Sequence, residues 1–102
     1  MINVIDKQRD ALTALCRRHR VRRLELFGSA ADGTYDPAKS DLDFLVVFFP
    51  MTPGAHYEAY FGLWEALRAL FGTRIDLVEA RAMRNPYFVR RVNESRKPVY
   101  AA

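Results

Sequence analysis

The sequence predicts a mixed α/β fold, in which a small mixed β-sheet carries helices packed mainly on one side. Segments with helical periodicity alternate with short apolar segments along the 102 residues. Half of the residues are hydrophobic and 27% are charged, which is the composition of a globular protein. Because this length suits one hydrophobic core, we expect residues 1–102 to form a single domain.

The first half of the chain predicts one long helix and two strands. The elements are, in order, a helix at 4–19, a basic link at 17–23, a strand at 24–27, a short helical turn at 30–33, a loop at 34–40 and a strand at 42–49. The helix has an apolar stripe at helical spacing, and an Asp-Pro pair marks the loop. The second strand is apolar on both faces, which predicts a central position in the sheet.

The second half predicts a long helix, a strand, a short helix and an edge strand. They lie, in order, at 54–71, at 74–78, from 85–86 onward and at 98–100. Thr52 suits the cap of the long helix, and Pro53 suits its first turn. Gly72 supplies the stop, because glycine readily adopts the left-handed conformation that ends many helices.

Three aspartates stand at or in the predicted strands. Asp41 and Asp43 open the strand at 42–49, and Asp76 lies within the strand at 74–78. Side chains two residues apart on a strand point to the same face, so Asp41 and Asp43 aim together, and a neighbouring strand would bring Asp76 beside them. Clustered carboxylates repel one another unless a cation holds them, and Mg²⁺ prefers oxygen ligands. The pattern predicts a catalytic metal site.

Gly28 and Ser29 mark the turn between the first strand and the short helical turn. Glycine leaves room for a phosphate there, and the serine hydroxyl and the first helical N–H groups are suited to bind it. A turn glycine and an N-cap serine also have ordinary structural roles, and these are compatible with phosphate binding. We therefore interpret Gly28 and Ser29 as nucleotide-binding residues, and the whole pattern as a nucleotide-transfer site.

Three segments carry a family resemblance: Leu26-Phe27-Gly28-Ser29, Asp41-Leu42-Asp43-Phe44-Leu45-Val46 and Ile75-Asp76-Leu77-Val78. With these segments at this spacing, the chain resembles the DNA polymerase β-like nucleotidyltransferase superfamily, and most closely its minimal, single-domain (MNT-type) branch. The similarity covers about residues 21–100, and its combined pattern is specific, whereas any one segment alone is weak. The resemblance implies a polymerase β-like nucleotidyltransferase fold.

The same resemblance implies the chemistry of the site. Gly28 and Ser29 would hold the phosphates of ATP, while Asp41 and Asp43 would bind two Mg²⁺ ions and Asp76 would complete the triad. Many members of this branch are antitoxins paired with a HEPN-type toxin, and some transfer AMP to a tyrosine of that toxin. The resemblance therefore implies a protein adenylyltransferase that acts as an antitoxin in the cytoplasm.

The chain departs from this branch directly after Gly28 and Ser29. The branch often has a basic stretch that ends in Arg-Gly, and here Asp32 stands in place of the expected arginine. A carboxylate near the polyphosphate would repel it or bind the metal instead, which predicts reduced affinity or activity. The alternative function is therefore an antitoxin or binding module that neutralises its partner by contact, with weak or no catalysis.

Charge and composition limit the kinds of partner that we expect for this chain. The net charge of +4 is uneven, because basic flanks surround an acidic middle, and such flanks suit an acidic partner. No recognition motif for nucleic acid accompanies them, so we do not expect a nucleic-acid partner.

The longest apolar run, residues 44–51, is too short to span a bilayer. Cys16 is the single cysteine, and no export signal is evident, so we expect the cytoplasm. The nucleotide preference, the acceptor residue and the oligomeric state stay open.

Overall fold

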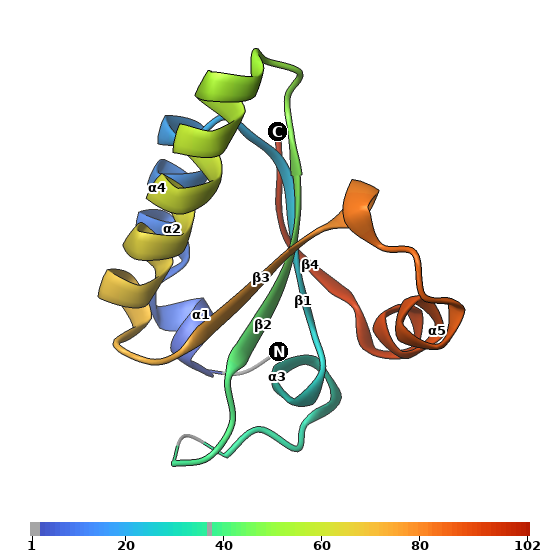
Figure 1. Ribbon diagram of the computed structural model, residues 1–102. Coiled ribbons are helices and arrows are strands. Elements are labelled where there is room, and N and C mark those ends of the chain that lie inside the picture. The colour runs from blue at the N-terminus through green and yellow to red at the C-terminus, as the bar shows by residue number, and fades with distance from the viewer. Residues whose placement is uncertain (1–2, 37) are drawn as a thin grey trace.

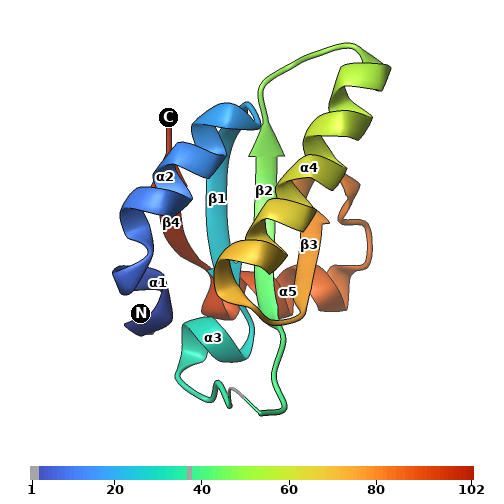
Figure 2. The same ribbon diagram turned by 90° about the vertical axis from the view of Figure 1, so that its left-hand side faces the viewer.

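The computed structural model describes residues 3–36 and 38–102. The elements are, in chain order, α1 (Asn3–Lys7), α2 (Arg9–Arg18), β1 (Val21–Phe27), α3 (Ser29–Asp32), β2 (Leu42–Phe48), α4 (Pro53–Phe71), β3 (Ile75–Glu79), the 3-10 helix η1 (Ala80–Ala82), α5 (Pro86–Ser95) and β4 (Lys97–Ala101). Helices α1, α2 and α4 cover one face of the sheet, and α5 packs on the other face (Figures 1 and 2). None of the helices in these ranges is long and apolar enough to cross a membrane.

The sheet has four strands in the order β3-β2-β1-β4. Strand β1 pairs antiparallel with both β2 and β4, whereas β2 pairs parallel with β3. The predicted mixed sheet is confirmed, with the apolar strand β2 in an inner position and the last strand at an edge. Figure 2 shows that β1 ends and β2 begins at the same end of the sheet, where α3 connects them.

The prediction of one helix over residues 4–19 is wrong, because α1 and α2 are separate helices that meet at Gln8. Strand β1 is also longer than predicted, since it begins at Val21 and includes Arg22 and Arg23. Arginines have no strong preference for strands, so this part of the chain resembled a basic link. Pairing of the buried Val21 with Phe48 of β2 outweighs that weak local preference.

The main core lies between the sheet and the three helices α1, α2 and α4. Helix α4 also covers the outer edge of β3 through two hydrogen bonds to the backbone. The Tyr60 hydroxyl donates to the carbonyl of Leu77, and Trp64 Nε1 donates to the carbonyl of Ile75 at 3.1 Å. These bonds satisfy outward carbonyls of an edge strand that would otherwise be open to another chain.

On the other side of the sheet, Arg96 ties the end of α5 to β1 by a buried ion pair. Glu25 is only 7% exposed, and both of its carboxylate oxygens accept hydrogen bonds from the Arg96 guanidinium, at 2.9 and 2.7 Å. The hydrogen bond from Arg96 lowers the pKa of Glu25, although burial opposes this effect. The Arg96 guanidinium is therefore the main partner of this buried carboxylate.

We expect Arg96→Met to lower the free energy of unfolding by about 2 kcal/mol at neutral pH, because the buried Glu25 carboxylate loses its bidentate partner. The matched variant Arg23→Met removes a more exposed partner of the same carboxylate and should cost less than about 1 kcal/mol. Urea denaturation measures both values. Since Glu25 has a lowered pKa, the effect of Arg96→Met should fade as the pH falls through that pKa. Equal losses in the two variants would contradict this assignment.

Candidate functional site

The turn after β1 is shaped by Gly28, which has a φ of +70°. A Cβ atom at this position would lie 2.4 Å from Oδ2 of Asp43, which is closer than any real contact. Both the backbone conformation and this close approach therefore require glycine. The carboxylate of Asp43 rests against the backbone of the turn at the start of α3.

Asp43 occupies the centre of the site because β2 lies between β1 and β3. It is paired with Phe27 of β1 on one side and with Asp76 of β3 on the other. Alternation along β2 and β3 places Asp41, Asp43 and Asp76 on the face that α5 covers, whereas their neighbours Leu42 and Leu77 enter the main core. The fold thus brings the three predicted carboxylates to one end of one face of the sheet.

The environment of Asp43 disfavours its charged form. Burial raises its pKa to about 6, and the nearby charges of Asp76 and Asp41 act in the same direction. The positive charge of Arg91 on α5 opposes them. Because two acidic neighbours and burial outweigh one cation, the site has an unmet need for positive charge.

Asp41 differs from the other two acids because it contacts a basic side chain, that of Arg74. Nε of Arg74 lies 2.8 Å from its Oδ1, but this buried oxygen has no aligned hydrogen-bond partner among the described residues. The contact is therefore an ion pair that leaves a lone pair of Oδ1 unused. Within residues 3–36 and 38–102, no group of three His, Cys, Asp or Glu side chains is arranged to hold a metal ion as it stands. Asp43 and Asp76 are the pair that the strand register joins directly.

Ser95 and Arg91 of α5 also belong to the site, and no sequence pattern predicted the part of Ser95. The backbone N–H of Gly28 donates to Oγ of Ser95 at 2.9 Å, so this N–H is already satisfied by α5. The hydroxyl of Ser29 makes no hydrogen bond to another group in the described part of the chain. Of the two residues predicted to hold phosphate, Ser29 therefore retains a free polar group, whereas the N–H of Gly28 is bonded to Ser95 and the space beside its Cα is filled by the Asp43 carboxylate.

Asp32 has a local structural role. Its Oδ1 accepts hydrogen bonds from the backbone N–H and the hydroxyl of Thr34, at 3.0 and 2.6 Å. These bonds lower the pKa of this exposed carboxyl group. The acid closes the turn that follows α3, which explains why an aspartate suits this position whatever its effect on phosphate.

Comparison with known proteins identifies the family. The model of the nucleotidyltransferase domain family matches residues 9–99 of this chain. The chain belongs to the nucleotidyltransferase family. A Methanocaldococcus jannaschii relative, MJ0128, whose name proposes protein adenylyltransferase activity, is 36% identical to this nucleotidyltransferase over 80 residues, which are 78% of each chain.

Solved structures share the fold of this nucleotidyltransferase. A structure described as a proposed minimal nucleotidyltransferase is 32% identical, with a TM-score of 0.65, and the match covers 91% of this chain and 90% of that one. A toxin–antitoxin structure with AMP-PNP gives a TM-score of 0.69 at 22% identity, covering 92% and 73%. A complex of the tri-AMPylated HEPN toxin of Shewanella oneidensis with MNT antitoxin gives 0.59 at 20% identity, covering 96% and 73%. The last two structures, at 22% and 20% identity, show only that the fold is shared.

A methyl group at position 28 tests the close approach of Asp43. Gly28→Ala should lower the free energy of unfolding by about 2 to 3 kcal/mol, because it adds a clash to a strained positive φ. Gly72→Ala is the control, since Gly72 also has a positive φ, of +63°, but no atom within 4 Å of the added Cβ. That control should cost only about 1 kcal/mol. Similar losses in both variants by urea denaturation would mean that Asp43 does not press on Gly28.

Because the pKa of Asp43 is raised, replacing this residue with neutral asparagine should stabilise the folded protein by an amount that depends on pH. The folded protein binds a proton at Asp43 with a pKa of about 6, against an ordinary value of 3.8, so ionised Asp43 destabilises the fold increasingly from pH 4 to 6 and fully above that range. Asp43→Asn should therefore raise the free energy of unfolding by about 1 to 2 kcal/mol at pH 7.5, after a discount for the partly exposed side chain.

The same variant should show little or no gain near pH 4, where Asp43 is largely protonated in the folded protein. Thermal melts at the two pH values measure the difference. Added Mg²⁺ should stabilise the wild type more than Asp43→Asn, because only the wild type has the ionised ligand. A gain that is equal at both pH values would contradict a raised pKa at Asp43.

Proposed function

We propose that this nucleotidyltransferase transfers AMP from ATP to a protein hydroxyl in a Mg²⁺-dependent reaction. The acceptor that we propose is a tyrosine of a HEPN-type toxin, so that the enzyme acts as an antitoxin. The observation that carries this proposal is the register that sets Asp43 between Gly28 and Asp76, on a face shared with Asp41. We further propose that residues 1–102 act as one minimal domain in the cytoplasm.

The reaction forms one phosphate ester and breaks one phosphoanhydride bond. The acceptor hydroxyl oxygen attacks the α-phosphorus of ATP, and the bond from that phosphorus to the β-phosphate oxygen breaks. Pyrophosphate leaves with the bonding electron pair, and the hydroxyl proton passes to a base. Asp76 is exposed on the edge strand β3, and we assign it the role of accepting this proton.

The residues present fit Mg²⁺ as the cofactor. Asp41, Asp43 and Asp76 offer only carboxylate oxygens, the ligand type that Mg²⁺ prefers, and Oδ1 of Asp41 is a buried oxygen without an aligned hydrogen bond. We propose that these three side chains hold two ions, which would supply charge neutralisation for the polyphosphate and the leaving group. Ser29 would donate its hydroxyl to the phosphates, and Gly28 would contribute by shaping the turn and admitting the Asp43 carboxylate beside it.

The choice of a protein acceptor is supported by the relatives of this chain. The name of MJ0128 proposes that it modifies proteins, and the Shewanella oneidensis complex contains a HEPN toxin that is AMPylated. The AMP-PNP in another toxin–antitoxin structure is an ATP analogue, which supports ATP as the nucleotide here. The buried single cysteine, Cys16, suits a reducing cytoplasm.

The double variant Asp41→Asn/Asp43→Asn tests catalysis against simple binding. It should abolish AMP transfer from labelled ATP to a purified HEPN-type toxin, the acceptor proposed here, because the transition state loses the groups that neutralise its charge. We expect a loss of several orders of magnitude in the rate of transfer. Binding of that partner, measured by calorimetry, should stay within about threefold of wild type, because rim contacts and chemistry use different groups.

Protection of cells that express the toxin then separates the two functions. If the protein is an enzyme, the double variant fails to protect although it still binds. If it is a contact antitoxin, the double variant protects as well as wild type at native expression levels, and the enzymatic proposal fails. Arg90→Gln serves as a matched control, because it removes an exposed charge from α5 without touching the three aspartates.

A further inference from the structure

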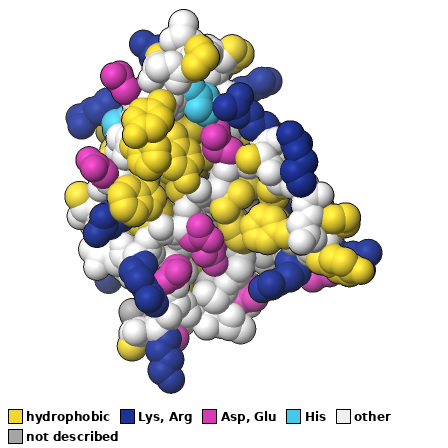
Figure 3. Space-filling model, viewed as in Figure 1, with side chains coloured by type: hydrophobic (Ala, Val, Ile, Leu, Met, Phe, Trp, Pro, Cys, Tyr) yellow, Lys and Arg dark blue, Asp and Glu magenta, His cyan; other side chains and the backbone are white. Residues whose placement is uncertain are grey.

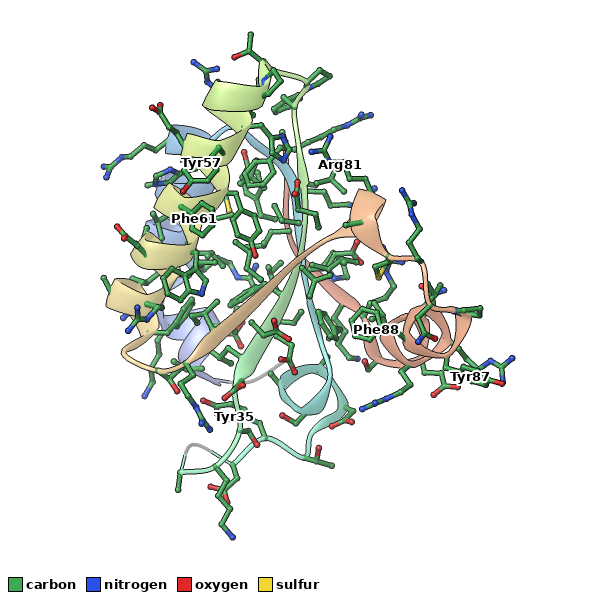
Figure 4. All side chains as sticks on the ribbon, in the orientation of Figure 1. Tyr35, Tyr57, Phe61, Arg81, Tyr87 and Phe88 are labelled. Atoms are coloured by element: carbon green, nitrogen blue, oxygen red, sulfur yellow. The ribbon has the colours of Figure 1, made fainter. Side chains whose placement is uncertain are left out.

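The N-terminal half of α4 and the end of β3 enclose an aromatic groove with a volume of about 350 Å³, lined by residues that include Met51, His56, Tyr57, Tyr60 and Phe61. Tyr57 is 66% exposed and Phe61 is 45% exposed, and their ring centroids lie 4.7 Å apart. Both rings project from α4 toward solvent in Figure 4. Adjacent exposed aromatic side chains are uncommon on a protein surface without a partner, because they leave apolar area in water.

The polar side of this aromatic groove is held in place by its own contacts. Nε2 of His56 donates to Glu79 at the end of β3, and Nη2 of Arg81 lies 3.1 Å from the same nitrogen. The His56 ring also packs edge-on against Phe48, with centroids 5.2 Å apart. These contacts hold the side chains of His56, Glu79 and Arg81 together at the end of the groove.

The aromatic groove lies at the edge of β3, and Asp76 lies on the other face of the same strand. Tyr60 lines the groove and donates its hydroxyl to the carbonyl of Leu77, the residue after Asp76. Burial raises the pKa of Tyr60, and the charges of Asp76 and Glu79 act in the same direction. Asp76 and Glu79 are about 10 Å apart at the rise of an extended strand. A ligand that straddles the β3 edge therefore reaches both.

The space-filling view supports this arrangement. Hydrophobic side chains gather over α4, and acidic side chains lie next to them in the middle of the same face of the molecule (Figure 3). Tyr57 and Phe61 lie on the α4 side of β3 in Figure 4, and Phe88 of α5 lies on the other side. A large ligand seated on the aromatic groove would cover the carboxylates, whereas a free small acceptor needs no such surface.

The accessible charge at the end of the aromatic groove is positive. Nε of Arg81 lies 3.6 Å from Oε1 of Glu79, which also pairs with His56, but the Arg81 side chain is 72% exposed whereas that of Glu79 is only 18% exposed. The glutamates of α4 face other hollows, with Glu58 beside Arg18 and Glu65 beside Arg68. An occupant that pairs with Arg81 must therefore carry a negative charge at that end, away from Asp76.

We propose that the acceptor protein docks on this aromatic groove through a surface that presents apolar side chains and a carboxylate. The apolar side chains would pack against Tyr57 and Phe61, and the carboxylate would pair with Arg81. Docking would then place a hydroxyl of the same protein at Asp76, across the edge of β3. This inference rests on the proposed function for the identity of the acceptor, and it adds the surface that recognises it.

The test measures binding and transfer with the same purified HEPN-type toxin. Tyr57→Ser/Phe61→Ser should raise its Kd at least about tenfold, and Arg81→Glu should do the same, because exposed aromatic and arginine side chains dominate such interfaces. Tyr87→Ser is the matched control, since Tyr87 is 76% exposed on α5 but lies outside the groove. Its Kd should stay within about twofold of wild type. Thermal melts verify that each variant folds.

Steady-state kinetics separate docking from chemistry. The groove variants should raise the KM for the acceptor protein and leave kcat near its wild-type value, because they weaken only association. If AMP is transferred but the groove variants keep the wild-type Kd, the docking inference fails and the proposed function stands. If the groove variants lose binding but wild type transfers no AMP, the docking inference stands and the proposed transfer fails. A wild-type protein that does not bind this partner at all would overturn both.

Discussion

The position of the Asp43 carboxylate is the constraint on which the rest of the site depends. Strand β2 is clamped between β1 and β3, so Asp43 is placed opposite Phe27 and Asp76 and pressed against Gly28. A shift of one residue in this register would turn the carboxylate into the main core. The fold accepts a buried, crowded acid here, and the cost appears as its raised pKa. Such a cost is typical of residues retained for chemistry rather than for stability.

Helix α5 determines the other wall of the site. Ser95 binds the backbone of Gly28, Arg96 binds the buried Glu25, and Arg91 contributes positive charge near Asp43. Phe88 packs edge-on against Phe27 at a centroid distance of 5.9 Å, which joins the helix to the end of β1. Helix α5 is thus held by a hydrogen bond to the backbone of Gly28, by an ion pair and by aromatic packing. The loss of any one of them would loosen the turn at Gly28.

The edge strand β3 lies between the carboxylate site and the aromatic groove. One side of it carries Asp76, and the hydrogen bonds from Tyr60 and Trp64 cover its outer carbonyls and fasten it to α4. Because those bonds satisfy the strand edge, β3 stays exposed without inviting another strand to pair with it. An open edge between an aromatic groove and a carboxylate pair suits a large acceptor that approaches from solvent. It suits a deeply enclosed small substrate less well.

The sequence by itself determined the alternation of elements, the mixed sheet and the candidate residues, because apolar periodicity, Gly28 and the acids at strand starts are local signals. It did not separate α1 from α2 or place Arg22 and Arg23 in β1, since strand pairing there overrides a weak local preference. Only the tertiary structure showed that Ser95 occupies the N–H of Gly28 and that Arg96 binds Glu25, at sequence separations of 67 and 71 residues. Contacts between segments so far apart depend on how the helices pack on the sheet, and no local pattern encodes them.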